Sequence, residues 1–246
     1  MHKPNSAQAL YNYNMAAKEN NNPHIGTLNE RSLHAALKKH LTQKGDQVEV
    51  KLENYVIDLM RGETLIEIQT RSFAAIRRKL EYLVPKYKIK LYHPIAARKW
   101  IVRVDSDGNF LKRRRSPRKG SPFDVFNELL SLRSVALHPN LELHILMIEV
   151  EEVWKDDGKG SWRKKFWSVH DHHLLKVTED YCLCSAEDYL ALLPEKLPEK
   201  FTNADLIVTQ RCTSRMAGKA TYSLREMGLI EQIGIQNRYH VFQRVK

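Results

Sequence analysis

Residues 47–70 constrain the fold more than any other part of the chain, because they combine three strand-like segments with one tight reversal. The segments are 48–52, 55–60 and 64–70, and each is short and rich in apolar or β-branched residues. Gly62 and Glu63 separate the second segment from the third. Glycine at the first central position suits a two-residue type II′ turn, whose twist matches that of the flanking strands. The pattern predicts an antiparallel meander.

The predicted turn also sets the register of the hairpin. If Gly62 and Glu63 are its loop, paired residue numbers sum to 125, so Asp58 lies opposite Glu67 and Val56 lies opposite Gln69. Directly opposed residues point to the same face of a sheet. The other face is then expected to enter the core with four apolar residues, Ile57, Leu59, Ile66 and Ile68.

Two interpretations of the paired carboxylates remain open. Like charges that face each other across a strand pair are destabilising. Mg²⁺ or Mn²⁺ held by Asp58 and Glu67 would remove that repulsion, and such ions serve phosphodiester chemistry. Alternatively, Asp58 and Glu67 are the solvated face of an amphipathic hairpin, which is the common role of charged residues on an exposed strand face.

The order of the elements resembles the core of the PD-(D/E)XK (restriction-endonuclease-like) nuclease superfamily over residues 24–95. A helix with Glu30 precedes the meander, whose strands carry Val56-Ile57-Asp58 and Glu67-Ile68-Gln69. The resemblance implies an α/β (α+β) fold with a mixed sheet flanked by helices. It also implies that Asp58 and Glu67 hold Mg²⁺ (or Mn²⁺), that Gln69 positions the attacking water, and that Glu30 joins the site.

One departure from that family's pattern separates two functions. Gln69 stands where the family has a lysine, and a carboxamide can orient water but carries no charge. Arg71 or Lys51 are candidates for the missing charge. The first hypothesis is a metal-dependent DNA endonuclease. The second is a catalytically inactive DNA-binding or assembly factor, for transposition, regulation or defence, on a nuclease-like scaffold.

The charge of the chain points to a polyanionic partner. The formal net charge is +11, and soluble proteins that basic commonly bind nucleic acid. Two clusters are expected to contact DNA, although solvated helix faces also carry such charges. The first lies in and before a helix expected over 73–87, with Arg71, Arg77 and Arg78. The second lies in an extended, mobile loop, with Arg113, Arg114, Arg115, Arg118 and Lys119.

Residues 199–246 have the order of a winged helix-turn-helix. Thr202 is expected to cap a helix over 203–208, a longer helix follows over 213–227, and a hairpin with its tip at 234–237 ends the chain. Its expected DNA contacts are Arg211, Arg215, Lys219 and Arg238. Winged helices also bind proteins, so a homodimer or a protein partner at this module is the alternative.

The remaining sequence predicts the domain limits and the compartment. We expect a flexible arm at 1–23, a nuclease-like domain at 24–190, and a linker at 190–198. Strands are expected at 88–93, 100–104 and 141–153, and a helix at 123–137. Two weaker metal signals, His170–His173 and Cys182-x-Cys184, are interpreted as surface groups and thiols rather than zinc ligands. Three cysteines and the lack of a long apolar run favour a reducing cytoplasm and no membrane.

Overall fold

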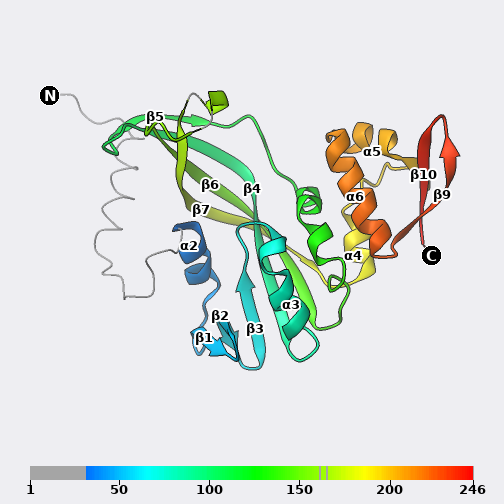
Figure 1. Ribbon diagram of the computed structural model, residues 1–246, viewed down its shortest axis with the longest axis horizontal. Coiled ribbons are helices and arrows are strands. Elements are labelled where there is room, and N and C mark those ends of the chain that lie inside the picture. Colours follow the sequence, from blue (N-terminus) through cyan, green and yellow to red (C-terminus); the bar gives the residue numbers. More distant parts are fainter. Residues whose placement is uncertain (1–31, 161, 165, 246) are drawn as a thin grey trace. The chain divides into compact units, whose positions relative to one another are not determined.

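The computed structural model describes residues 32–160, 162–164 and 166–245 (Figure 1). The expected arm at 1–23 and Glu30 lie outside these residues. The described chain is mixed α/β, as expected, with a seven-stranded mixed sheet and a smaller three-stranded antiparallel sheet near the C-terminus. No helix among the described residues is both long enough and apolar enough to span a membrane.

The large sheet has the order β1-β2-β3-β4-β6-β7, and β5 pairs with β4. Its strands are β1 Gln47–Leu52, β2 Tyr55–Arg61, β3 Thr64–Ile68, β4 Lys88–Val104, β5 Phe110–Arg115, β6 Leu141–Lys155 and β7 Ser168–Leu183. The pairs β1–β2, β2–β3 and β4–β5 are antiparallel, and β3–β4 is parallel. The segment between β3 and β4 contains the 3₁₀ turn η1 Phe73–Ala75 and the helix α3 Arg77–Leu83.

The other helical elements are α2 Ser32–Leu41, η2 Pro122–Asn127, η3 Leu129–Leu132, η4 Trp162–Lys164 and α4 Ala186–Ala191. The C-terminal part consists of β8 Lys200–Thr202, α5 Asn203–Gln210, α6 Ser214–Glu226, β9 Ile230–Gln236 and β10 Tyr239–Arg244. Its small sheet has the order β8-β10-β9. The helix–helix–hairpin order expected for this part is therefore confirmed, with one added strand.

The chain divides into two compact units, each built from three segments. The first contains Met1–His40, Ala96–Lys119 and Ile148–Val177, and the second contains Leu41–Ile95, Gly120–Met147 and Thr178–Lys246. Strands β4, β6 and β7 have residues in both units. The meander and the C-terminal helices belong to the second unit.

The predicted hairpin register is confirmed. Arg61 pairs with Thr64, Met60 with Leu65 and Leu59 with Ile66, so each pair sums to 125. Gly62 has a φ of 57°, which the first central position of a type II′ turn requires. The four apolar residues assigned to the core face (Ile57, Leu59, Ile66 and Ile68) are all buried.

The two strands expected at 88–93 and 100–104 are one strand, β4, which passes through Pro94. The pairing of β4 with β3 ends at Tyr92, and its pairing with β5 begins at Trp100. Pro94 lies between these two stretches, where its missing N–H removes no ladder bond to β3 or β5.

The α-helix expected over 123–137 is instead two 3₁₀ segments, η2 and η3. Its buried residues explain the difference. Phe123, Phe126, Leu129 and Leu132 are all buried and lie three positions apart. A 3₁₀ helix has three residues per turn and aligns such residues on one side, whereas an α-helix would spread them. Similarly, the helix expected over 73–87 is split into η1 and α3, and α3 ends before Pro85.

Two further expectations need correction. The basic loop expected to be extended and mobile is strand β5 as far as Arg115, paired with β4. The tip of the C-terminal hairpin is Asn237-Arg238 rather than 234–237, because these two residues have φ values of 48° and 69°. Positive φ at both central positions is the geometry of a type I′ turn, which asparagine adopts readily. The cap at Thr202 is confirmed. Thr213, expected as the first residue of the longer helix, is instead its N-cap.

Candidate functional site

The β2–β3 hairpin brings Asp58 and Glu67 close together, although its ladder ends one pair earlier, at Leu59 and Ile66. The Ile68 amide donates a hydrogen bond to Asp58 Oδ2 at 2.8 Å. The negative charge of Asp58 acts on Glu67, which also accepts a hydrogen bond from the Asp58 backbone. The two carboxylates are therefore neighbours at one end of the hairpin.

Glu67 is the buried member of this pair, with a relative exposure of 4%. Burial raises the pKa of the Glu67 carboxyl to about 7, and the Asp58 charge adds to this effect. Lys79 acts in the opposite direction and lowers the pKa of Glu67. A buried carboxyl with a neighbouring like charge and a nearby amine is a common feature of functional sites.

Lys79 supplies the positive charge that position 69 lacks. Its side chain comes from α3, and Nζ donates to Glu67 Oε1 at 2.5 Å and to the Val56 carbonyl at 2.6 Å. The amine therefore connects the backbone of β2 with the Glu67 carboxylate of β3. Lys79 was not among the residues expected at the site. A signal was present, because Lys79 lies three residues after Ile76 and four before Leu83, both of which are buried.

Gln69 lies just beyond the end of β3 and is bound into a loop. Its side-chain oxygen accepts from the Arg71 amide at 3.1 Å. Its own amide donates to the Tyr92 carbonyl at 2.9 Å, and His93 Nδ1 lies 2.7 Å from its carbonyl. The β2–β3 pairs end at Leu59 and Ile66, so the ladder reaches neither of the two expected pairs, Asp58–Glu67 and Val56–Gln69.

Arg71 and Lys51 were considered as replacements for the charge that Gln69 lacks, and both have exposed positions. Arg71 is exposed after β3, and Lys51 is exposed on β1, where it pairs with Val56. Of the four residues expected at the catalytic site, the structure therefore joins Asp58 with Glu67. It places Gln69 at the end of the same strand, and Glu30 lies outside the described residues.

Residues 31–184 match the family model described as "Domain of unknown function (DUF8091)". The match covers more than half of the chain. The chain belongs to this family. A relative from Treponema pallidum (strain Nichols), named "Uncharacterized protein", is 32% identical over 186 residues, which are 75% of this chain and 74% of the relative. No solved structure matches the chain.

The DUF8091 region contains the whole large sheet, and with it the first basic cluster. Arg71, Arg77 and Arg78 are exposed, on and before α3. Arg77 Nε lies 3.9 Å from Glu81 Oε1, four residues further along the helix. Exposed ion pairs of this kind contribute little to stability, so these arginines remain accessible to a phosphate.

The second basic cluster of the DUF8091 region is more structured than expected. Arg113 Nε lies 2.6 Å from Glu151 Oε1, and the guanidinium lies 4.9 Å from the centre of the Trp100 ring. Arg113 therefore stabilises the sheet. The other four residues of this cluster are exposed: Arg114, Arg115, Arg118 and Lys119.

Residues 199–246 lie outside the DUF8091 match, and their basic residues fall into two groups. Arg211, Arg215 and Arg238 are exposed, at the end of α5, at the start of α6 and in the β9–β10 turn. Lys219 instead donates to the Asn127 carbonyl at 2.8 Å. One face of α6 is therefore partly bound to η2.

Proposed function

We propose that this chain is a metal-dependent DNA endonuclease whose site is Asp58, Glu67 and Lys79. The observation that carries the proposal is the joint position of these three side chains. Two carboxylates come from adjacent strands, and an amine from α3 bonds to one of them at 2.5 Å. Two acidic groups and one cation are what hydrolysis of a phosphodiester needs near the scissile bond.

The donor set suits Mg²⁺ or Mn²⁺. Mg²⁺ binds through one or two carboxylates and keeps several waters, and Asp58 and Glu67 provide two. Burial, and to a lesser extent the Asp58 charge, raise the pKa of Glu67, and a cation bound by both carboxylates would relieve their repulsion. When bound, the ion supplies a Lewis acid and a water of lowered pKa.

The remaining roles belong to side chains of the chain itself. Lys79 fixes the orientation of Glu67, and its ammonium places a positive charge where negative charge develops on the phosphate. This is the charge that Gln69 cannot supply. Arg71 and Arg78 are exposed, the first after β3 and the second on α3 beside Lys79 in the sequence, and both would contact the DNA backbone.

A catalytically inactive DNA-binding or assembly factor is the second candidate, and the C-terminal helices favour it. Lys219 and Glu226 lie on one face of α6. Lys219 binds the Asn127 carbonyl, and Glu226 Oε2 lies 3.8 Å from Arg133 Nε. Arg215 is at the start of this face, which would have to enter a DNA groove. A helix partly bound to the rest of its unit is better suited to protein contacts than to reading bases.

A cleavage assay with matched variants separates the two candidates. Supercoiled plasmid, branched DNA and single-stranded DNA are incubated with the full chain in Mg²⁺, Mn²⁺ or EDTA. We expect metal-dependent cleavage that falls strongly in Asp58→Asn and Glu67→Gln. Glu63→Gln is the control, because Glu63 is an exposed carboxylate in the turn of the same hairpin.

The assay also has an outcome that removes the nuclease proposal. If the full chain binds DNA but cleaves none of these substrates with either ion, the binding or assembly role replaces it. Cleavage that survives in both carboxylate variants would come from a contaminant and would have the same consequence.

A further inference from the structure

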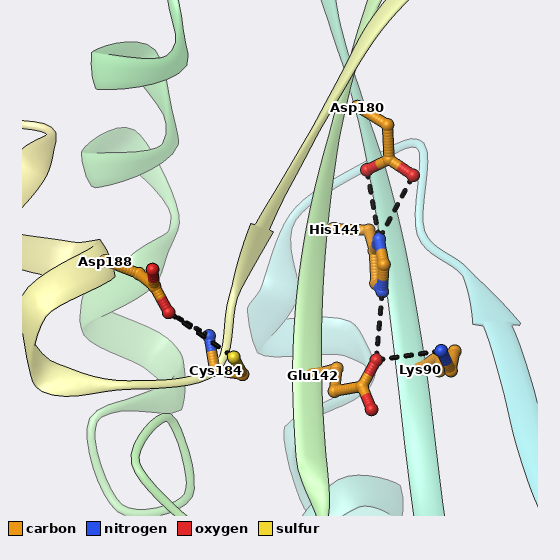
Figure 2. A network of polar contacts seen from close by, with 6 residues as sticks. All are labelled: Lys90, Glu142, His144, Asp180, Cys184 and Asp188. Carbon is orange, nitrogen blue, oxygen red and sulfur yellow. Dashed lines mark hydrogen bonds and ion pairs between the residues drawn. The ribbon is translucent and has the colours of Figure 1, made fainter.

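The face of the sheet opposite Glu67 carries a second polar cluster. Lys90 and Tyr92 of β4 pair with Ile66 and Ile68 of β3, so they point away from the face that carries Glu67. The same side of β6 carries Glu142 and His144, and the end of β7 adds Asp180 and Cys182. Figure 2 shows four of these residues, from Lys90 to Asp180, in one chain of contacts.

Three side chains of this cluster have the spacing of metal ligands. One ligand atom each from Glu142, His144 and Cys182 lie within 4.8 Å of one another. In the described part of the chain, this is the group of three or more acidic, histidine or cysteine residues with that spacing. Glu142 and His144 are two positions apart on β6, so a single strand presents both on one face.

His144 is held in place before any ligand binds. Its Nδ1 lies 3.0 Å and 3.2 Å from the two oxygens of Asp180. The ring stacks on Tyr92 with 4.5 Å between centroids, and only 8% of the residue is exposed. A carboxylate on one ring nitrogen fixes the tautomer and directs the other nitrogen toward a metal, as in many zinc sites.

The second nitrogen of His144 faces another carboxylate. Nε2 lies 3.3 Å from Glu142 Oε2 (Figure 2). A neutral imidazole has one N–H and one lone pair. With the N–H donated to Asp180, the lone pair of Nε2 and the Glu142 carboxylate both point at the same place. A cation there would be bound by both, and the Cys182 sulfur lies beside them.

We propose that Glu142, His144 and Cys182 form a binding site for Zn²⁺, with Asp180 as the residue that positions His144. Zinc is the expected ion because it accepts oxygen, imidazole nitrogen and thiolate together. Mg²⁺ is not expected, because it binds oxygen ligands and water. Binding forms a Zn–S bond and releases the thiol proton of Cys182 to solvent.

Charge and access both suit such an ion. Lys90 Nζ lies 2.9 Å from Glu142 Oε2, and Glu142 and Cys182 both act electrostatically on this amine. Asp180 and Cys182 also line an open cleft of about 490 Å³, so the site has an entry path. Cys184, which bonds to Asp188 at the start of α4 (Figure 2), is a second thiol and lies directly after the end of β7.

The test measures Zn²⁺ itself on the full chain. The apo protein is titrated with Zn²⁺ by calorimetry, and with Co²⁺ by absorption, because a thiolate ligand gives cobalt a characteristic charge-transfer band. We expect one ion per chain and the thiolate band. Both should be lost in Cys182→Ser and His144→Gln. Cys212→Ser and His240→Gln are matched controls with the same chemistry outside the cluster, and both should bind normally.

Two results would overturn the site. One is a full chain that binds no Zn²⁺ at micromolar concentrations. The other is binding that persists in both Cys182→Ser and His144→Gln, which would place the ion on other histidines of the chain. His144→Gln changes a buried residue and can therefore fail to fold. In that case the exposed Cys182→Ser variant still tests the site. Asp58→Asn should bind Zn²⁺ normally, so this result is independent of the nuclease proposal.

Discussion

The two polar clusters of the large sheet lie on opposite faces and differ in almost every chemical respect. The cluster on one face consists of Asp58 and Glu67, with oxygen donors and a buried carboxyl. The cluster on the other face adds imidazole and thiol donors from His144 and Cys182. Each contains one lysine bonded to a glutamate, Lys79 at 2.5 Å and Lys90 at 2.9 Å.

The difference between the clusters shows how one sheet can support two sites. Neighbouring residues on a strand point to opposite faces, so Glu67 of β3 and Lys90 of β4, which pairs with Ile66, belong to different faces of the same sheet. Hard oxygen donors suit Mg²⁺ or Mn²⁺, whereas a set with sulfur and nitrogen suits Zn²⁺. The chemistry of each face therefore predicts a different ion, and the variants below test whether the two sites are independent.

The largest expected effect is the loss of one activity without the other. Asp58→Asn should lower metal-dependent DNA cleavage by about 100- to 1,000-fold, because it removes a charge at the centre of the site. The same variant should bind Zn²⁺ like the wild type. Cys182→Ser should show the reverse pattern. Parallel cleavage and calorimetry on both variants measure this, and loss of both functions in either variant would mean that the clusters are coupled.

The next effect is on the pH dependence of stability. The Glu67 carboxyl has a pKa of about 7 in the folded protein, above its ordinary value of 4.5, because it is buried. The folded state therefore holds its proton more tightly, and stability falls as pH rises from 4.5 to about 7. The difference corresponds to about 3 kcal/mol. Denaturant unfolding across this range should show a decline in the wild type relative to Glu67→Gln.

Saturating Mg²⁺ sharpens the same measurement. A cation that binds the ionised carboxylates should reduce the decline in the wild type and leave Glu67→Gln unchanged. If the stability of the wild type and of Glu67→Gln changes with pH in parallel, with and without Mg²⁺, then Glu67 does not titrate in this range. The claim that burial raises its pKa to about 7 would then be wrong.

A smaller effect is expected at Asp180. Asp180→Asn should weaken Zn²⁺ binding by about 10- to 100-fold. The group that hydrogen-bonds the non-ligating nitrogen of a metal-binding histidine typically contributes that much to metal affinity. DNA cleavage should not change. The Co²⁺ spectrum of this variant should keep the thiolate band, since Cys182 is intact. A variant that binds Zn²⁺ as tightly as the wild type would show that Asp180 does not position His144.

The smallest effect compares the two lysines. Lys90 holds Glu142, so it competes with the ion, and Lys90→Met should strengthen Zn²⁺ binding by a few-fold. Lys79 supplies charge to the opposite site, so Lys79→Met should weaken cleavage. Titration calorimetry and initial cleavage rates measure the two changes. If both variants change their site in the same direction, the lysines have the same role, and the contrast drawn between the faces fails.

The features that were predicted from sequence are those that depend on neighbours in the chain. The Gly62-Glu63 turn set the register of its hairpin, because two residues connect the strands and leave no freedom to slip. The cap at Thr202 was predicted for the same reason, since a hydroxyl reaches an amide three residues away. The pairing of Asp58 with Glu67 followed directly from that turn.

The expectations that failed depend on partners that are distant in the chain. The basic segment expected to be a loop is strand β5, because β4 provides its hydrogen bonds. The helix expected over 123–137 has the tighter 3₁₀ geometry, which aligns its apolar residues at intervals of three. No local pattern distinguishes these outcomes, since the same residues would suit either form in another environment.

The sequence alone determined the hairpin, its paired carboxylates and the C-terminal order of helices and strands, because turns and caps act over a few residues. Only the tertiary structure decided that Lys79 bonds to Glu67, and that Glu142 and His144 meet Cys182. These contacts join elements whose distance in the chain has no bearing on their distance in space. Sheet pairing and helix packing set that distance, and so they place the charges and ligands on each face.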